Sequence, residues 1–115
     1  MPKQPLSRIE LLQGTLDFII LQTLRWGPRH GYGLSQMIRA SSNDSLRVDT
    51  GSLYPALHRL ERRGVISEAW GETDTGRQAK YYTLTAAGRA HLRAESARWT
   101  AYSRAVTRAL AVSSA

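Results

Sequence analysis

The sequence predicts a mainly α-helical fold with a small β-hairpin and a long C-terminal helix. Apolar residues recur at helical spacing through the N-terminal half, which indicates amphipathic helices. Two short segments rich in aromatic and β-branched residues flank the polar loop at residues 71–78, which indicates a hairpin. Near the C-terminus, large apolar residues recur at heptad spacing. With 115 residues and 42% hydrophobic content, the chain is expected to form one globular domain.

The first helix is expected to begin after Ser7, which fits a capping box with Glu10, while residues 1–6 are expected to be disordered. Gly14 interrupts the helical pattern, so either the helix begins there or a close neighbour requires the missing side chain. An apolar stripe continues to Trp26. Its members are Leu12, Leu16, Ile19, Ile20 and Leu24.

A turn at residues 27–31 separates this helix from a second one, which is expected from Tyr32 to about Ala40. Residues 41–48 are predicted to be a polar connector. Within it, residues 46–48 are predicted to form a small strand that pairs with the hairpin.

The third helix is predicted to begin at residues 49–51, whose side-chain oxygens can cap a helix, and to end near Gly64. A single apolar stripe runs along it, formed by Leu53, Leu57 and Leu60. The opposite face carries small and basic residues, namely Gly51, Pro55, His58, Arg59 and Arg62. Small residues let another backbone come close, and arginines bind phosphates or guanine edges. Taken alone, such a face is also typical of an ordinary solvated helix.

Residues 65–70 and 80–84 are predicted to be the two strands of the hairpin. Alternation along the second strand places Tyr82 and Leu84 on one face, so one tyrosine is expected to pack inward. The cations that flank the outer end are Arg77 and Lys80. A basic hairpin directly after a basic-faced helix has the layout of a winged helix-turn-helix. In that fold the helix enters the DNA major groove and the wing touches the neighbouring backbone or minor groove.

The charge of the chain favours an anionic partner. Its formal net charge is +7 and its isoelectric point is about 10.6, which suits nucleic acid or an acidic membrane surface. All cations except Lys3 and Lys80 are arginines, which suits phosphate recognition but can equally reflect the codon usage of a GC-rich genome. No apolar run approaches about 18 residues, and the N-terminus has no signal-peptide core. A soluble cytoplasmic protein without a membrane span is expected.

Catalysis, a metal and a bound cofactor are not expected. His30, His58 and His91 lie on three different predicted elements, and none has metal-ligand spacing with acidic neighbours. The sequence has no nucleophile elbow and no Gly-rich phosphate loop. It also has no cysteine, which excludes disulfides and thiolate metal sites.

Four motifs follow one another along the chain: GTLDFIILQTL, GPRHGYGL, GSLYPALHRLERRGVI and GRQAKYYTLTAAGRAHL. In this order they resemble the PadR family of bacterial transcriptional regulators, over residues 11 to about 110. The resemblance implies a homodimeric winged helix-turn-helix repressor that binds a pseudo-palindromic operator in double-stranded DNA. In some members a small molecule releases the repressor. The resemblance also implies DNA contacts by Ser52 and Tyr54, a phosphate contact by Tyr32, and a wing-tip contact by Arg77.

The residue pattern adds further candidate DNA contacts, which are Thr50, His58, Arg59 and Lys80. Arg59 points away from the leucine stripe, so it is expected to contact a base edge or a phosphate. Tyr54 flanks the stripe, so it either contacts DNA or lies half in the core. Arg62 and Arg63 are expected to be solvated charges favoured by the helix dipole.

Residues 85–115 are predicted to form a long helix capped by Thr85, which follows the DNA-binding domain of residues 1–84. One side of this helix carries a heptad seam, formed by Leu92, Trp99, Tyr102, Val106 and Leu110. A seam this narrow cannot be buried by the small body alone, so it is interpreted as a dimer interface. The alternative is a helix that packs back on its own domain.

The single C-terminal helix resembles the short members of the PadR family, some of which carry a tryptophan at the position of Trp99. In a few of these, flat aromatic molecules sit between the tryptophans of two subunits. Trp99 therefore either contributes to a slot for a small aromatic effector or only packs. Two other functions stay open. One is a winged helix that binds protein and not DNA, and its third helix would have an apolar or acidic face. The other is a dimer that mainly senses a ligand.

Overall fold

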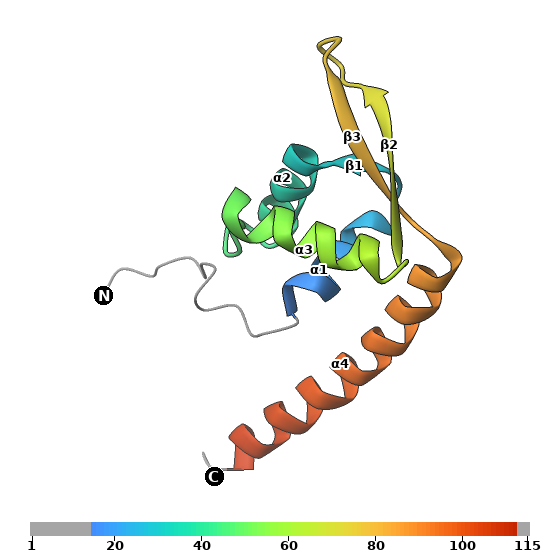
Figure 1. The fold of residues 1–115 in the computed structure, drawn as a ribbon. Helices are drawn as coiled ribbons and strands as arrows, with labels where there is room; N and C mark the ends of the chain where they lie inside the picture. Colours follow the sequence, from blue (N-terminus) through green and yellow to red (C-terminus); the bar gives the residue numbers. More distant parts are fainter. Residues whose placement is uncertain (1–14, 113–115) are drawn as a thin grey trace.

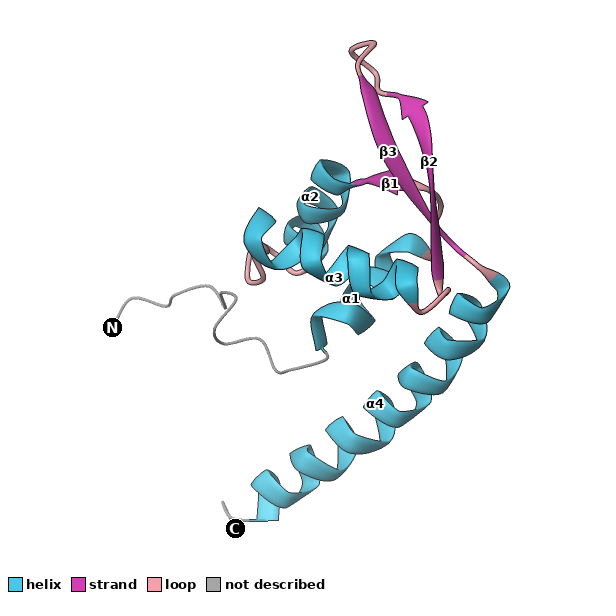
Figure 2. Ribbon diagram, in the orientation of Figure 1, coloured by secondary structure: helices cyan, strands magenta, loops and turns pink. Residues whose placement is uncertain are grey.

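The computed structural model describes residues 15–112. Three short helices pack together, a β-hairpin stands up from one side of them, and a long helix extends away below (Figures 1 and 2). This arrangement confirms the predicted fold class. In chain order the elements are α1 (Thr15–Leu24), β1 (Arg29–His30), α2 (Gly31–Ser41), α3 (Thr50–Arg62), β2 (Ile66–Glu72), β3 (Gln78–Leu84) and α4 (Ala86–Val112).

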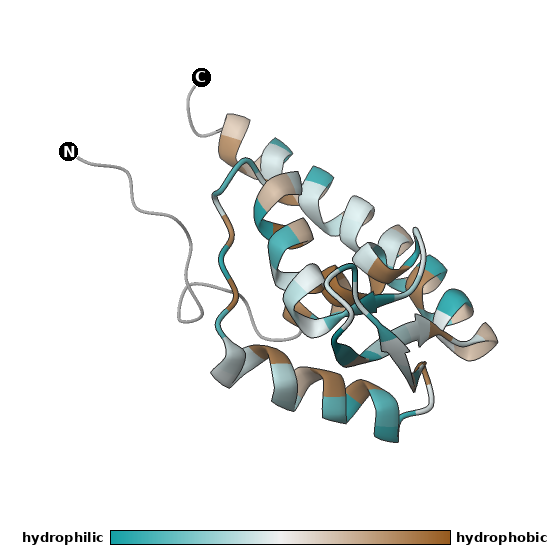
Figure 3. Cartoon of the chain, turned by 90° about the horizontal axis from the view of Figure 1, so that it is seen from above, coloured by the Kyte–Doolittle hydropathy of each residue, from teal (hydrophilic) through white to brown (hydrophobic). Residues whose placement is uncertain are grey.

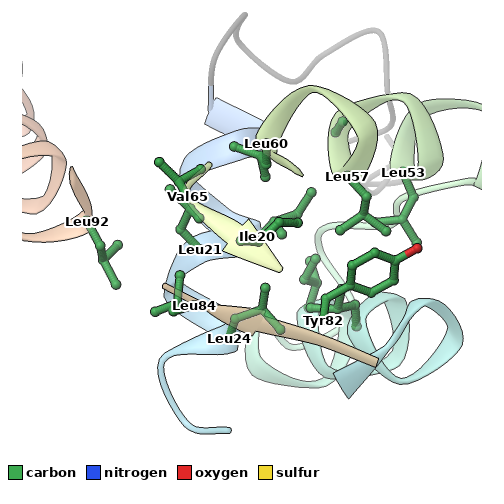
Figure 4. Close-up of a cluster of buried hydrophobic side chains, with 14 residues drawn as sticks. Ile20, Leu21, Leu24, Leu53, Leu57, Leu60, Val65, Tyr82, Leu84 and Leu92 are labelled. Atoms are coloured by element: carbon green, nitrogen blue, oxygen red, sulfur yellow. The ribbon is translucent and has the colours of Figure 1, made fainter. Parts of the chain in front are cut away.

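The core lies where α1, α2 and α3 meet the inner face of the hairpin (Figure 4). The predicted stripe of α3 is confirmed, since Leu53, Leu57 and Leu60 are all buried. The inward face of the second hairpin strand is confirmed as well, because Tyr82 and Leu84 are both buried. Full burial of each such side chain stabilises the fold by about 1.5–3 kcal/mol. This cluster therefore dominates the stability of the part formed by α1 to β3, which we call the body.

The C-terminal end of α1 differs from the prediction. The helix ends at Leu24, before Trp26, which is 71% exposed. Its last turns supply Ile20, Leu21 and Leu24 to the core. The capping box at Ser7, the question of Gly14 and the tail at residues 1–6 all lie outside the described residues.

The strand that joins the hairpin was predicted in the wrong place. The sheet has the order β1-β3-β2, and β1 pairs antiparallel with β3, with Arg29 opposite Tyr82. Of residues 46–48, only Leu46 has β structure, as a single bridge, and Leu46 and Val48 pack against the core as partly buried side chains. The chain reverses after α1 at Gly27, whose φ of +137° favours glycine, and this turn brings Arg29 beside β3.

The two later helices begin at the predicted caps. The Asp49 carboxylate accepts a hydrogen bond of 2.8 Å from the Ser52 amide at the start of α3. At the start of α4, the Thr85 hydroxyl accepts a bond of 3.0 Å from the Gly88 amide. Gly88 also allows α4 to lie against the hairpin, because an added Cβ would be only 1.9 Å from the Val65 carbonyl oxygen. The start of α4 is therefore fixed against the body.

Beyond its first turns, α4 extends away from the body (Figure 1). The helix is 27 residues long. In Figure 3 its last turn, next to the C-terminus, is coloured as hydrophobic, and Leu110 there is 67% exposed. No helix within residues 15–112 is long and apolar enough to span a membrane.

Candidate nucleic-acid interface

An open groove of about 900 Å³ lies between the N-terminus of α2, the first half of α3 and the outer half of the hairpin. We call it the wing groove. It brings together four of the predicted DNA contacts, which are Tyr32, Tyr54, Arg77 and Lys80. These residues come from three separate segments of the chain, and only the fold places them around one surface.

Tyr32 is held outward into the wing groove by two neighbours. Its ring is 68% exposed and stacks on the His30 ring, with centroids 6.5 Å apart and an interplanar angle of 12°. The Gln36 amide donates a hydrogen bond of 2.6 Å to the Tyr32 hydroxyl. The side chain thus has a defined position on the surface, which reduces the entropy lost when it contacts a ligand.

His30 organises this end of the groove. Its Nδ1 accepts a hydrogen bond of 3.0 Å from the Gly33 amide and caps α2, and its ring meets the Tyr81 ring edge-on at 5.3 Å. His30 and Gln36 both line the groove and were not among the predicted site residues. A histidine directly before a predicted helix was the available signal for the cap, whereas the Gln36 contact depends on the side-chain conformation of Tyr32.

Tyr54 occupies an intermediate position between core and surface. Its side chain is 42% exposed in the groove, yet its hydroxyl lies against the backbone of α2. A Cβ added at Gly31 would be only 2.4 Å from this hydroxyl oxygen. Gly31 therefore permits the close approach that fixes Tyr54, a contact between two helices that no local sequence pattern indicates.

The tip of the hairpin holds Arg77 in place through its backbone. The Thr73 amide donates to the Arg77 carbonyl at 2.8 Å, and the Arg77 amide donates to the Thr73 hydroxyl at 3.2 Å. Gly76 has a φ of +81°, which the turn requires. The Arg77 side chain is exposed and forms no ion pair within the described residues. Its charge is therefore available to an anion at the wing tip.

Lys80 differs from Arg77 in having partners on the hairpin. Its Nζ lies 3.2 Å from a Glu68 carboxylate oxygen and 5.7 Å from the centroid of the Trp70 ring. A contact with DNA would have to compete with this ion pair. Arg77 is therefore the wing cation without an ion pair within residues 15–112, although the carboxylates of Glu72 and Asp74 lie in the same tip.

Arg59 points away from the leucines, as predicted, but it forms an ion pair with α1. Its Nη2 lies 2.8 Å from Oδ1 of Asp17 on α1, so the side chain is bound to the neighbouring helix. Asp17 is the more buried partner, with a side-chain exposure of 18% against 49% for Arg59. The helical period correctly placed Arg59 away from the leucines, but it could not show that α1 borders this side of α3. Contact with a base edge requires the ion pair to open.

The other predicted contacts on α3 lie outside the lining of the wing groove. Thr50 and His58 are exposed, and Ser52 is partly buried with its amide bonded to the cap. Arg63 has a side-chain contact with His91 of α4 at 3.4 Å, so the last turn of α3 faces the C-terminal helix. The first part of α3, beside the groove, is the part that is free to approach a ligand.

Two side chains around the site, one on β3 and one in the connector after α2, have a shifted pKa. Burial, followed by the negative charge of Glu68, raises the pKa of Tyr82 at the floor of the groove. Its hydroxyl is therefore neutral at physiological pH. Hydrogen bonds from Arg47 and Arg39 lower the pKa of Asp44, so this carboxylate stays charged and clamps the connector between α2 and α3.

The predicted seam of α4 divides into two parts. Trp99, Tyr102, Val106 and Leu110 are between 38% and 67% exposed. Leu92 is only 5% exposed and belongs to the core of its own chain, which corrects its expected place in a dimer interface (Figure 4). The reason is that the first turns of α4 still lie against the body. Trp99 follows at the boundary, 6.4 Å from the Phe18 ring of α1 and 6.1 Å from the Tyr102 ring.

A helix with its N-terminal half beside a groove, a preceding short helix and a hairpin that carries an exposed arginine at its tip define a winged helix-turn-helix of the nucleic-acid-binding class. The model of the PadR-like family of transcriptional regulators matches residues 20–94. The chain therefore belongs to the PadR-like family. Members of this family are transcriptional regulators and not enzymes.

Individual relatives agree with this assignment. The chain is 43% identical over 63 residues to the transcriptional regulator Rv3488 of Mycobacterium tuberculosis, a match that covers 55% of each protein. The structure of a PadR-like transcriptional regulator from Bacillus cereus is similar with a TM-score of 0.76 and 28% identity, covering 86% of this chain and 94% of that chain. A transcriptional regulator from Clostridium thermocellum has a TM-score of 0.75 and 28% identity, with coverage of 84% and 93%.

Proposed function

We propose that this transcriptional regulator is a homodimeric repressor that binds an inverted-repeat operator. The observation that carries the proposal is the wing groove, which joins the fixed tyrosines of α2 and α3 to Arg77, an exposed arginine without an ion pair within residues 15–112. In this proposal the first half of α3 enters the major groove of DNA. Tyr32 and Arg77 contact phosphates on either side, and Thr50, Ser52 and Tyr54 face the bases or the adjacent backbone. His58, Arg59 and Lys80 are secondary contacts.

The dimer is proposed from the outer half of α4. Its exposed apolar residues lie on one side of a helix that extends beyond the body, where the described part of the chain offers no element to cover them. A second copy can cover them through the same seam, which satisfies the symmetry of a two-fold dimer. Residues 1–84 then act as the DNA-binding domain and residues 85–115 as the dimerisation segment. The proposed location is the bacterial cytoplasm, at the nucleoid.

Release by a small aromatic effector is a further part of the proposal. Trp99 and Tyr102 place two aromatic rings at the inner end of the exposed seam, and Phe18 of α1 lies beside them. A flat molecule inserted between two such sites would touch both α4 and α1. Because α1 is bound to α3 through Asp17 and Arg59, such binding has a physical route to the DNA-binding surface.

The protein-interaction alternative is less well supported. Its expected signature was an apolar or acidic face on the third helix. The exposed face of α3 carries His58, Arg59 and Arg62 and has no acidic residue in its first turn. The charge of this surface suits an anionic polymer.

Selection of sites from random duplex DNA with the purified full chain, followed by footprinting, tests the proposal. An enriched inverted repeat is expected, with half-sites about 10 base pairs apart, because a two-fold dimer meets successive major grooves. If the dimer contacts roughly six to ten phosphates, affinity should fall by about three orders of magnitude or more between 50 and 200 mM salt. Recovery of no enriched repeat, together with a flat salt response, would overturn the proposal.

A further inference from the structure

A second concave surface lies away from the wing groove, where the end of α1 meets the first half of α4. Its volume is about 310 Å³, at the lower end of the range for small-molecule pockets. We call it the arginine cleft, and it shares no lining residue with the wing groove. Its lining residues are Arg25, Leu84, Arg89, Leu92, Arg93 and Ser96.

Three cations surround this small space. Within residues 15–112, none of Arg25, Arg89 and Arg93 forms an ion pair with a carboxylate. Arg89 and Arg93 are one helical turn apart on the same face of α4, where like charges destabilise the helix. A bound anion would remove this repulsion. The charge pattern therefore favours an anionic occupant.

Arg25 is held near the mouth of the cleft by an aromatic ring. Its guanidinium carbon lies 5.3 Å from the centroid of the exposed Trp26 ring. Such a cation–π contact orients the side chain and leaves its N–H groups free to donate. The three guanidinium groups together provide enough donors for a phosphate or carboxylate, which arginine binds through paired hydrogen bonds.

The lower part of the cleft is apolar. Leu84 and Leu92 are each 5% exposed, and they lie at the junction of β3 and α4. Ser96 adds one hydroxyl beside them. The leucines are largely covered already, so the rest of the apolar lining comes from the methylene stems of the three arginines. A simple inorganic anion can satisfy the guanidinium groups but cannot cover these stems. An anion with an attached apolar body can do both.

We propose that the arginine cleft binds a small organic anion that carries a phosphate or carboxylate group on an apolar body. The site is separate from the Trp99 slot, because Trp99 lies further along α4 and is not among the residues that line the arginine cleft. This proposal concerns binding alone and does not depend on the function proposed above.

Calorimetric titration of the full chain with 1-naphthyl phosphate tests the site. Two matched compounds separate the contributions of charge and apolar group to binding. The first, 1-naphthol, has the apolar group without the charge, and inorganic phosphate has the charge without the apolar group. We expect saturable binding of 1-naphthyl phosphate, at least about tenfold tighter than either compound, a ratio that corresponds to one power of ten in Kd. Equal affinity for inorganic phosphate would overturn the proposal, since it would show only a basic surface.

Arginine substitutions test whether 1-naphthyl phosphate binds at the arginine cleft. The double variant Arg89→Ser/Arg93→Ser should weaken 1-naphthyl phosphate binding at least about tenfold. Arg104→Ser/Arg108→Ser removes two exposed arginines with the same spacing from the same helix and should leave binding unchanged. Circular dichroism of both variants verifies that they fold. Equal losses in the two double variants, or a loss only in Arg77→Ala at the wing tip, would overturn the proposal.

DNA binding by the same variants distinguishes the two proposals. Arg89→Ser/Arg93→Ser should bind duplex DNA within about threefold of the unchanged protein, because the cleft has no residue in common with the wing groove. A loss of DNA affinity as large as that of Arg77→Ala would assign the cleft to the DNA interface and reject it as a separate site. A failure of DNA binding in every protein, including the unchanged one, would count against the proposed repressor and leave the calorimetric result valid.

Discussion

The wing groove and the outer half of α4 both expose aromatic side chains, but they hold them in different ways. In the groove, Tyr32 is fixed by His30 and Gln36. On α4, Tyr102 has only its neighbour Trp99 as an aromatic contact, and the apolar residues beyond it stay exposed. The groove is thus organised by one chain, because it must present a surface of fixed shape. The seam of α4 keeps an exposed apolar surface, which a second chain would cover in the proposed dimer.

Charges placed on the seam should have the largest effect, because they act on both halves of a dimer. In Val106→Asp/Leu110→Asp, carboxylates would enter a surface that dimerisation desolvates. The expected result is a monomer by light scattering and operator affinity lower by about 100-fold or more, since the two half-sites no longer bind jointly. Ala101→Asp on the opposite face of α4 is the matched control. A double variant that stays dimeric would show that the seam is not the interface.

Gly31→Ala should disturb the groove and leave the seam intact. The new Cβ would overlap the Tyr54 hydroxyl, so Tyr54 must move away from α2. Such overpacking costs about 1–3 kcal/mol in the free energy of unfolding, measured by urea denaturation. DNA affinity should fall with it, and the dimer should persist.

A second substitution separates the two consequences of Gly31→Ala. The double variant Gly31→Ala/Tyr54→Ala should recover most of the stability that Gly31→Ala loses, because the overlapping ring is gone. Its DNA affinity should stay low. Gly51→Ala serves as the control, since an added Cβ there meets its nearest atom at an ordinary 3.4 Å. Recovery of DNA binding in the double variant would remove Tyr54 from the proposed interface.

Arg77→Ala should have a smaller and less specific effect. Its charge at the wing tip is expected to meet a phosphate, so operator and random DNA should lose affinity equally, by about 1 kcal/mol each. The slope of log affinity against log salt should decrease by about one. Gln78→Ala, the neutral neighbour on β3, should change neither quantity. A loss confined to the operator would instead indicate a base contact.

The features that were predictable from sequence are those fixed by near neighbours along the chain. The leucine stripe of α3, the inward face of Tyr82 and Leu84, and the cap at Thr85 all follow from local periodicity or side-chain chemistry. For the same reason the bounds of α3 were close to those observed.

The features that were missed join segments far apart in sequence. β1 was placed at residues 46–48 because pairing with β3 depends on how the chain turns at Gly27. Leu92 was given to the dimer seam because a heptad pattern does not show where the body ends and the free helix begins. The predicted DNA contacts could be named one by one from the sequence, but their arrangement around one groove could not. That arrangement depends on contacts that exist only in the folded chain, where Gly31 fixes Tyr54 and His30 stacks on Tyr32.

The ion pair of Arg59 and Asp17 offers the smallest effect and the sharpest test of how the two regions communicate. Asp17 precedes Phe18, which contacts Trp99 of α4, so α1 lies between the seam and the DNA-binding helix. Asp17→Asn should release Arg59 with little cost in stability, because a half-exposed pair contributes only about 0–1 kcal/mol. If the released arginine contacts DNA, affinity should rise by up to about fivefold, the gain that corresponds to removing this competition.

Arg59→Ala should abolish that gain in the double variant Asp17→Asn/Arg59→Ala. The matched comparison is Glu95→Gln, which removes the partner of Arg98 in the middle of α4, away from α3. Like Asp17→Asn, the Glu95→Gln variant raises the net charge of the protein by one. Its DNA affinity therefore measures the general electrostatic effect of losing one carboxylate. An equal rise in DNA affinity for Asp17→Asn and Glu95→Gln would show that Arg59 acts only through overall charge. A larger rise for Asp17→Asn would show that α1 restrains a DNA-contacting residue, which gives the aromatic rings at Phe18 and Trp99 a direct physical link to DNA binding.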